Sequence, residues 1–439
     1  MSARRLAMAA LAAALVASAC TDPVPGPAPS APAAAPPSVP DPSPSTVDTG
    51  AGSAMATLHE LCTLPRLQMG RPATGDGSVP AFVHAVEQVA AAHRGLDFLH
   101  EVPVDVATDA HLDARLAEIL DASISPEQLD RRTLAWRTIG VIPPDADLAR
   151  AVRAYYAGEV LGFYVPETGE LVFTGSAAQP SLLEGVVLAH ELTHALDDQH
   201  FDLVRVDRLG SHCRDELSMA ALGAVEGSAQ YFATTAIADL RPIANGTGIA
   251  DVGGGTPPDV PPFFQALQQW PYAAGTTFIR SRFQEGGTAA VDQAIRHLPV
   301  STEQILHPQR YPNDTPQPLD VPDLFDGLGR GWRDLDVMEV GEAWLHLALS
   351  LRIDGVLLDR ATPGWDGGIY RAWTDGDQVA VVLHTVWDTP DDADEFAAAM
   401  RAWIGEGSGP AAVTQPDPAH VEVAFASDQQ LVDLLVALS

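Results

Sequence analysis

The sequence predicts a helix-rich α+β protein. Most stretches with regularly spaced apolar residues follow the 3.6-residue period of a helix, and residues 181–200 form the longest of them. The alternation that is typical of strands is confined to short runs, such as Val102–Val106, and to the last hundred residues. With 439 residues, the chain is long enough for two or three domains.

Residues 1–19 have the features of a secretory signal. A short basic start precedes an apolar run, Leu6–Ala19, which is too short for a stable membrane span. The residues before Cys20 resemble a lipobox, the site at which bacterial lipoproteins receive a diacylglycerol on a cysteine. We therefore expect an exported protein that a lipid on Cys20 anchors to the cell membrane. Ordinary cleavage after Ala19, without a lipid, is the alternative.

Residues 20–55 are rich in proline and alanine. Such a segment cannot bury a core and stays extended, so we interpret it as a tether between the membrane and the folded part. If Cys20 carries the lipid, Cys62 and Cys213 remain as an even pair in an oxidising compartment. We expect a disulfide between these two cysteines.

The formal net charge of −33 excludes some classes of partner. The chain contains no lysine, so each of its basic side chains is an arginine. Nucleic acid is not an expected partner, because binding phosphates requires a basic patch. Anionic membrane surfaces would also repel the chain, and the acidity is best explained by solubility.

The folded part is expected to hold a larger domain over residues 56–330 and a smaller α+β subdomain over residues 335–439. In the larger domain, residues 80–160 have mostly helical spacing, interrupted by one strand around Val104. Residues 163–173 predict a hairpin, because apolar strands flank the turn sequence Pro-Glu-Thr-Gly.

Residues 181–200 are predicted to form one helix that starts with a capping box. Ser181 is followed three residues later by Glu184, so each side chain can bond to the other residue's backbone N–H. The apolar run Val186–Ala189 indicates that this helix is buried.

The same helix carries the pattern His-Glu-x-x-His. His190 and His194 lie four residues apart, so both imidazoles project from one face of the helix, one turn apart. At that separation two nitrogens can bind one tetrahedral Zn²⁺ ion. Glu191 lies beside His190, where its carboxylate can reach a water on the ion without being a ligand. The sequence therefore predicts a zinc site.

A catalytic zinc site needs a third protein ligand, and the sequence offers two. Glu226 lies in an Ala/Gly-rich stretch that predicts a second helix, which can pack closely against the first. His200 has the spacing of a three-histidine motif, but that motif usually has Gly where this chain has Asp197, at the turn out of the helix. If the helix continues past Asp197, His200 rotates away from the metal face. We favour Glu226.

This arrangement resembles the gluzincin class of zinc metallopeptidases. Further stretches, such as Gly162–Val172, Pro271–Gly275 and Ser301–Pro308, resemble a family of uncharacterised bacterial metallopeptidase-like lipoproteins over about residues 80–400. The resemblance implies a zincin-like core, made of an edge hairpin, the metal helix and a second helix with the ligand glutamate. It also implies a peptide or protein substrate, which can add as one more strand beside the hairpin.

One position departs from the gluzincin pattern. Many members have an aspartate four residues after the ligand glutamate, where it orients a zinc histidine, and this chain has Gln230. Another group must then orient the histidine. Asp197, Asp198 and a backbone carbonyl are the candidates.

Downstream of Glu226, residues 245–262 form a Gly/Pro-rich loop, which is either a lid or a surface excursion. Two helices are expected after it, over residues 263–268 and 273–284. His307 is the candidate to stabilise the oxyanion formed during attack on an amide. Arg310 and Tyr311 are alternatives for the same role.

The C-terminal subdomain is expected to contain helices over residues 341–351, 391–403 and 428–438. Strands are expected over residues 370–373, 378–386 and 421–424.

The function expected from these observations is zinc-dependent hydrolysis of peptide bonds on the outer side of a bacterial membrane. Zn²⁺ on His190, His194 and Glu226 would activate a water, and Glu191 would take its proton. The alternative is a membrane-anchored binding or structural lipoprotein with an idle zinc site.

Overall fold

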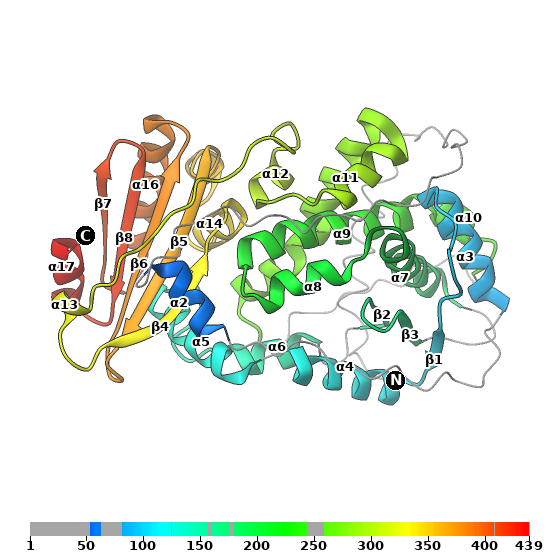
Figure 1. Ribbon diagram of the computed structural model, residues 1–439, viewed down its shortest axis with the longest axis horizontal. Helices are drawn as coiled ribbons and strands as arrows, with labels where there is room; N and C mark the ends of the chain where they lie inside the picture. Colours follow the sequence, from blue (N-terminus) through cyan, green and yellow to red (C-terminus); the bar gives the residue numbers. More distant parts are fainter. Residues whose placement is uncertain are drawn as a thin grey trace.

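The computed structural model describes residues 53–62, 81–123, 125–156, 160–174, 180–244, 259–407 and 409–438. The predicted signal and lipid site, and most of the loop 245–262, lie outside these ranges. The described chain combines many helices with two separate sheets (Figure 1). The predicted helix-rich α+β class is therefore confirmed. No helix in these ranges has both the length and the apolar composition that are needed to cross a bilayer.

One part of the molecule, the metal half, is a helical body with a small sheet. The sheet has the order β1-β3-β2, in which β1 (Val104–Ala107) pairs with β3 (Glu170–Thr174) in parallel. β2 (Gly162–Val165) pairs with β3 in antiparallel register, which confirms the predicted hairpin. The helices of this half are α3 (Ala81–Arg94), α4 (Asp109–Ser123), α6 (Leu148–Tyr156), α7 (Leu182–Phe201), α8 (Val204–Ser211), α9 (Asp215–Thr235), α10 (Ile237–Leu240), α11 (Pro262–Arg296) and α12 (Thr302–Leu306).

Helices α9 and α11 approach each other so closely that only glycine fits at their contact. A Cβ atom on Gly275 would lie 1.9 Å from the carbonyl oxygen of Gly223, and one on Gly227 would lie 2.2 Å from the carbonyl carbon of Gly275. Gly227 directly follows Glu226. The close contact between α9 and α11 therefore also restrains the position of the predicted ligand Glu226 relative to α7.

Helix α11 differs from the two helices expected in this region. It continues through Pro271, and its backbone leaves helical geometry only at Gly286 and Gly287. Proline removes one backbone hydrogen bond from a helix. The extensive packing of α11 against α9 outweighs this local cost.

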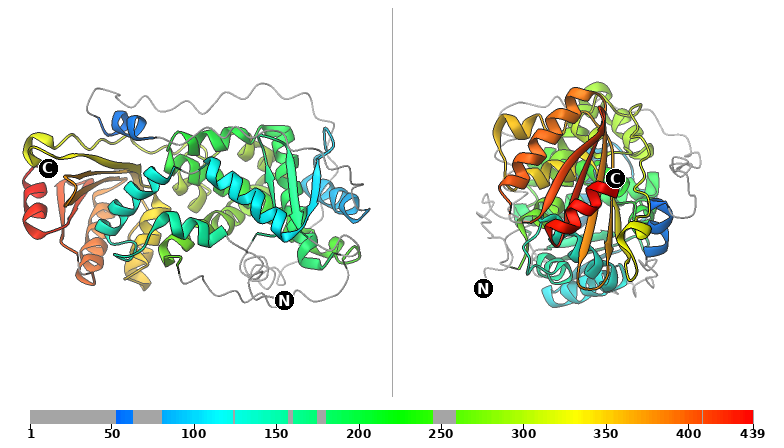
Figure 2. Two further views of the ribbon diagram at one scale, coloured as in Figure 1. Left: turned by 90° about the horizontal axis from the view of Figure 1, so that it is seen from below. Right: turned by 90° about the vertical axis from the view of Figure 1, so that its left-hand side faces the viewer.

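The other part, the sheet half, is built on five antiparallel strands in the order β4-β5-β6-β8-β7 (Figure 2). Its strands are β4 (Arg333–Glu339), β5 (Trp365–Thr374), β6 (Val379–Trp387), β7 (Ala411–Asp417) and β8 (His420–Ala426). Its helices are α13 (Phe325–Leu328), α14 (Glu342–Leu349), α15 (Gly355–Asp359), α16 (Pro390–Gly405) and α17 (Gln429–Leu438). β4 and β7 are strands that the sequence pattern did not reveal.

Successive residues of the strands face two different cores. Tyr370 and Leu383 face one core with α14 and α16, whereas Trp373 and Val382 face the other core with α17. Both faces of this sheet are therefore covered, which explains why its strands are apolar at consecutive positions.

Two helices from the start of the chain belong to the sheet half. α2 (Ala54–Leu61) packs in the same core as α17, and α5 (Pro126–Ile139) packs against β4 and β6. The expected division placed α5 and most of α2 in the larger domain, and it assigned Ala54 and Met55 to the tether. Cys62, at the end of α2, forms a disulfide with Cys213, between α8 and α9. The expected pairing is confirmed, and it joins the two halves.

Candidate metal centre

Helix α7 begins as the sequence predicts. The Ser181 hydroxyl accepts a hydrogen bond from the N–H of Glu184 at 3.2 Å, and the Ser181 N–H donates to the Glu184 carboxylate at 2.6 Å. Together the two bonds satisfy backbone groups that a helix start leaves unpaired. Leu188, Leu192 and Leu196 are fully buried, so the helix is held firmly between its neighbours.

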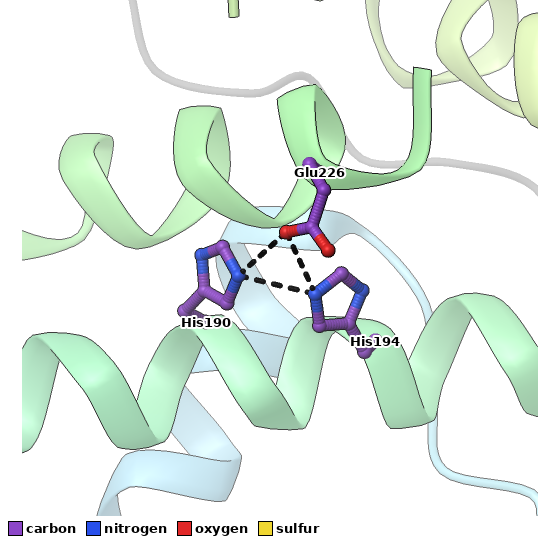
Figure 3. A group of neighbouring side chains, drawn as sticks. All are labelled: His190, His194 and Glu226. Atoms are coloured by element: carbon purple, nitrogen blue, oxygen red, sulfur yellow. Dashed lines mark hydrogen bonds and ion pairs between the residues drawn. The ribbon is translucent and has the colours of Figure 1, made fainter. Parts of the chain in front are cut away.

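Three side chains from α7 and α9 meet at one point (Figure 3). Their facing atoms form a triangle: His190 Nε2 lies 3.1 Å from His194 Nε2 and 3.2 Å from Glu226 Oε2. The third side, from His194 Nε2 to Glu226 Oε2, is 3.3 Å. The structure thus brings together the two predicted histidines and the favoured third residue.

The triangle has the dimensions of a zinc site. Zn–N and Zn–O bonds of about 2.0 to 2.1 Å at tetrahedral angles place neighbouring ligand atoms about 3.3 Å apart. Two imidazoles and one carboxylate are also a donor set found in catalytic zinc sites, where a fourth position stays open. The residues present therefore fit Zn²⁺ in both spacing and chemistry.

The electrostatics of the triangle favour a positive charge at its centre. Burial lowers the pKa of His194, but the Glu226 carboxylate outweighs this effect and raises the pKa to about 9. Burial in turn raises the pKa of Glu226, but His194 and His190 bring it far below its usual range. A metal ion at this point would displace that proton, because a histidine ligand must be neutral.

Glu191 lies beside the triangle without belonging to it. Its side chain is buried, and its carboxylate accepts a hydrogen bond from the backbone N–H of Tyr164 on β2. Burial raises the pKa of Glu191, and the neighbouring His190 and His194 partly oppose this rise. A carboxylate with a raised pKa is better matched to a proton transfer near neutral pH than an ordinary one.

His200, the alternative third ligand, is directed elsewhere. α7 continues to Phe201, and its left-handed end residue is Asp202, with φ of 57°, instead of Asp197. The helix therefore rotates His200 away from the triangle, and its Nε2 lies 2.8 Å from the carbonyl oxygen of Asp97.

The two aspartates considered as partners of the zinc histidines bond to other groups. Asp197 accepts hydrogen bonds from Arg94 Nε at 2.6 Å and from the Ser228 hydroxyl at 2.7 Å. Asp198 accepts from the Tyr164 hydroxyl at 2.7 Å. Asp197 and Arg94 are fully buried, so they form an ion pair beneath the metal face that links α3 to α7.

The three residues considered for the oxyanion are engaged at other places. His307 Nε2 lies 3.0 Å from Glu342 Oε1 on α14. Arg310 forms ion pairs with Glu303, Asp314 and Asp388. Tyr311 donates a hydrogen bond to the carbonyl oxygen of His297. None of the three belongs to the group of ligand atoms formed by the described residues.

The structure adds residues to the centre that motif reasoning missed. The ring of Tyr272, on α11, stacks on His190 with centroids 6.0 Å apart. A cavity of about 150 Å³ adjoins Glu226, and its wall includes Tyr156, Leu267 and Tyr272. Tyr272 lies within the stretch Pro271–Gly275 that resembles the metallopeptidase-like lipoproteins, but no spacing rule assigns it a role.

Comparison with known proteins concerns only the sheet half. Residues 333–433 match DUF8575, a domain of unknown function. The match runs from β4 into α17, so the metal centre lies outside it. No curated protein and no solved structure matches the chain.

Proposed function

We propose that the protein is a zinc-dependent peptide hydrolase with a zincin-like core. The observation that carries this proposal is the triangle of His190, His194 and Glu226, with side lengths that fit one tetrahedral zinc ion. Glu191, buried next to this triangle, has the place and the raised pKa of a general base.

In the proposed reaction, the chain positions a water and moves its proton. His190, His194 and Glu226 would hold the Zn²⁺ ion, which would supply Lewis acidity that lowers the pKa of a water toward ~7 and polarises a carbonyl. Glu191 takes the proton of the attacking water and then passes it to the leaving amine. The Tyr164 N–H orients the Glu191 carboxylate, and the stacked ring of Tyr272 limits the rotation of His190.

The edge of β2 that has no partner strand among the described residues favours an extended peptide as the substrate. On β3, the N–H of Leu171 bonds to the carbonyl of Pro103, toward β1. Its partner Tyr164 therefore turns its backbone away from β3, toward the side of β2 that has no neighbouring strand among the described residues. A peptide that adds there as a strand lies next to Glu191. The apolar cavity beside Glu226 offers room for one of its side chains.

We place this activity outside the cell membrane, with a lipid on Cys20 as the anchor. The signal-like segment and the cysteine that follows it support this placement. The Cys62–Cys213 disulfide supports it independently, because disulfides persist in oxidising compartments.

The test measures zinc and cleavage separately. We expect wild-type protein to hold one zinc per chain by elemental analysis and to cleave members of a peptide library. Glu191→Gln should keep the zinc and lose about 10²-fold or more of the rate, because it removes the base but no ligand. Glu226→Ala and His194→Ala should lose zinc, whereas His200→Ala, on the same helix, is the matched control and should keep it.

Two outcomes would contradict the proposal. Full activity of Glu191→Gln would remove the mechanism. Zinc in the wild type without cleavage of any peptide would favour the alternative, an anchored binding or structural protein with an idle zinc site.

A further inference from the structure

A second cavity lies within the sheet half, between the end of α5 and residues of α16, β7 and β8, apart from the residues of the metal centre. It has a volume of about 450 Å³, within the range of sites that bind small molecules. One wall is the end of α5 and the turn after it, from Arg137 to Pro144. The opposite wall contains Arg352, Trp403 of α16, Ala411 of β7 and Phe425 of β8.

Two backbone carbonyls and an indole ring hold the guanidinium of Arg352 in this wall. Nη2 donates to the carbonyl of Gly140 at 2.8 Å, Nη1 donates to the carbonyl of Trp403 at 3.3 Å, and the Trp403 ring centroid lies 3.7 Å from the guanidinium carbon. A Cβ atom on Gly140 would lie 2.9 Å from Nη2, and one on Gly407 would lie 2.3 Å from Nη1. Two glycines thus make room for this cation.

Among the residues that the structure describes, Arg352 has no carboxylate counterpart for its charge. Among the described residues, no acidic side chain lies within ion-pairing distance of Arg352 or of Arg137, and both line the cavity. Burial alone lowers the pKa of Arg352. Arg132, a buried arginine on the same helix as Arg137, differs, because it pairs with both Asp215 and Asp336.

The two arginines keep donors for a ligand. A guanidinium has five N–H donors, and the described contacts of Arg352 use two of them. Arg137 Nε donates to the carbonyl of Ala146 at 2.9 Å. Its Nη1 and Nη2 groups remain as the pair of donors that can bind a carboxylate in a bidentate way. Pro144, Leu351 and Ile404 supply apolar surface to the rest of the lining.

We propose that this cavity binds a small carboxylic acid with an apolar or aromatic body. The carboxylate pairs with Arg137 and Arg352, and the body packs against the exposed apolar part of the lining, which includes Pro144, Leu351 and Ile404. A cavity of about 150 Å³ is enough for benzene, so about 450 Å³ has room for a ring with its acidic arm. Nothing in this proposal depends on the zinc centre or on hydrolysis.

The experiment uses phenylacetate as the probe and its neutral counterpart, phenylacetamide, as the control ligand. Binding to the purified protein is measured by titration calorimetry and by saturation-transfer NMR. We expect phenylacetate to bind about tenfold or more tightly than phenylacetamide, because a charge-assisted bidentate pair is lost in the amide. Arg137→Gln should weaken phenylacetate by a similar factor and leave phenylacetamide unchanged.

Two further variants locate the binding. Arg153→Gln removes an exposed arginine of α6 and should leave binding unchanged, which controls for net charge. Ala411→Phe places a ring in the cavity and should abolish binding of both probes. Equal binding of acid and amide, or binding that survives both Arg137→Gln and Ala411→Phe, would overturn the proposal, and so would the absence of binding.

Discussion

The two halves of the molecule reach close packing by opposite means. In the metal half, α9 and α11 touch through Gly223, Gly227 and Gly275, so backbone meets backbone. In the sheet half, large rings fill the core, and Trp365, Trp373, Trp387 and Trp403 are all fully buried or nearly so. The metal half therefore tolerates little added volume, whereas the sheet half tolerates little removed volume.

The largest effect is expected from adding volume in the metal half. Gly275→Val forces backbone atoms apart, since its Cβ would lie 1.9 Å from a carbonyl oxygen. We expect a loss on the order of 5 kcal/mol in the free energy of unfolding, measured by urea denaturation, with loss of zinc from any folded fraction.

Gly185→Ala is the matched control for that change. Gly185 lies on the metal helix itself, but a Cβ atom there meets nothing within 4 Å. Since alanine is the better helix former, we expect unchanged zinc binding and a gain of up to about 1 kcal/mol. Equal damage by both variants would show that the glycine contact has no special role.

Removing volume from the sheet half should cost somewhat less and spare the metal centre. Phe396 on α16 is fully buried and stacks on Trp387 with centroids 4.6 Å apart. Phe396→Ala should lower the free energy of unfolding by about 3 to 5 kcal/mol through the cavity it leaves. The zinc content of the folded protein should stay at the wild-type value. A loss of zinc would mean that zinc binding in the metal half depends on packing in the sheet half.

Reducing the disulfide should have a smaller effect that falls on both halves. The Cys62–Cys213 bond joins residues 151 positions apart and connects α2 of the sheet half to the turn before α9. We expect the Cys62→Ser, Cys213→Ser double variant to lose about 2 to 4 kcal/mol of stability. Unchanged denaturation curves for the oxidised and reduced protein would contradict this expectation.

Within any one pH unit, the smallest effect is expected at the junction of the two halves, where stability changes with pH. Glu216, on α9, is buried, and this raises its pKa from 4.5 to about 8, although hydrogen bonds from Thr302 oppose the rise. The folded state then holds a proton that the unfolded state releases, so stability falls as pH rises from about 4.5 to about 8.

Glu216→Gln removes this dependence, because glutamine does not titrate. The difference in the free energy of unfolding between wild type and variant should change by about 1 kcal/mol per pH unit between pH 5 and pH 8. Glu127→Gln, at an exposed position of α5, should leave the pH dependence unaltered. A constant difference between wild type and Glu216→Gln would disprove the raised pKa.

What the sequence predicts well is what depends on neighbouring residues. The Ser181 and Glu184 capping box and the placement of His190 and His194 on one face follow from the geometry of a single helix. The capping box is present in the structure, and the two histidines meet. The sequence favours Glu226 over His200 as the third ligand, because the Ala/Gly-rich helix that carries Glu226 can pack closely against the helix of the two histidines.

What the sequence does not reveal depends on contacts between distant segments. Asp197 pairs with Arg94, which lies 103 residues away, so local spacing holds no sign of it. His307 bonds to Glu342 of α14, and only the docking of the sheet half brings the two together. The two helices expected over residues 263–268 and 273–284 are one helix, α11, which continues through Pro271 and packs along α9.

The location of α2 has a consequence for the order in which the chain assembles. Residues 54–61 leave the ribosome early, yet the strands on which they rest begin only at residue 333. Their apolar side therefore stays uncovered through most of synthesis. Cys62 can form its disulfide only after Cys213, 151 residues later, has been synthesised. The native state can therefore form only after the last quarter of the polypeptide has emerged.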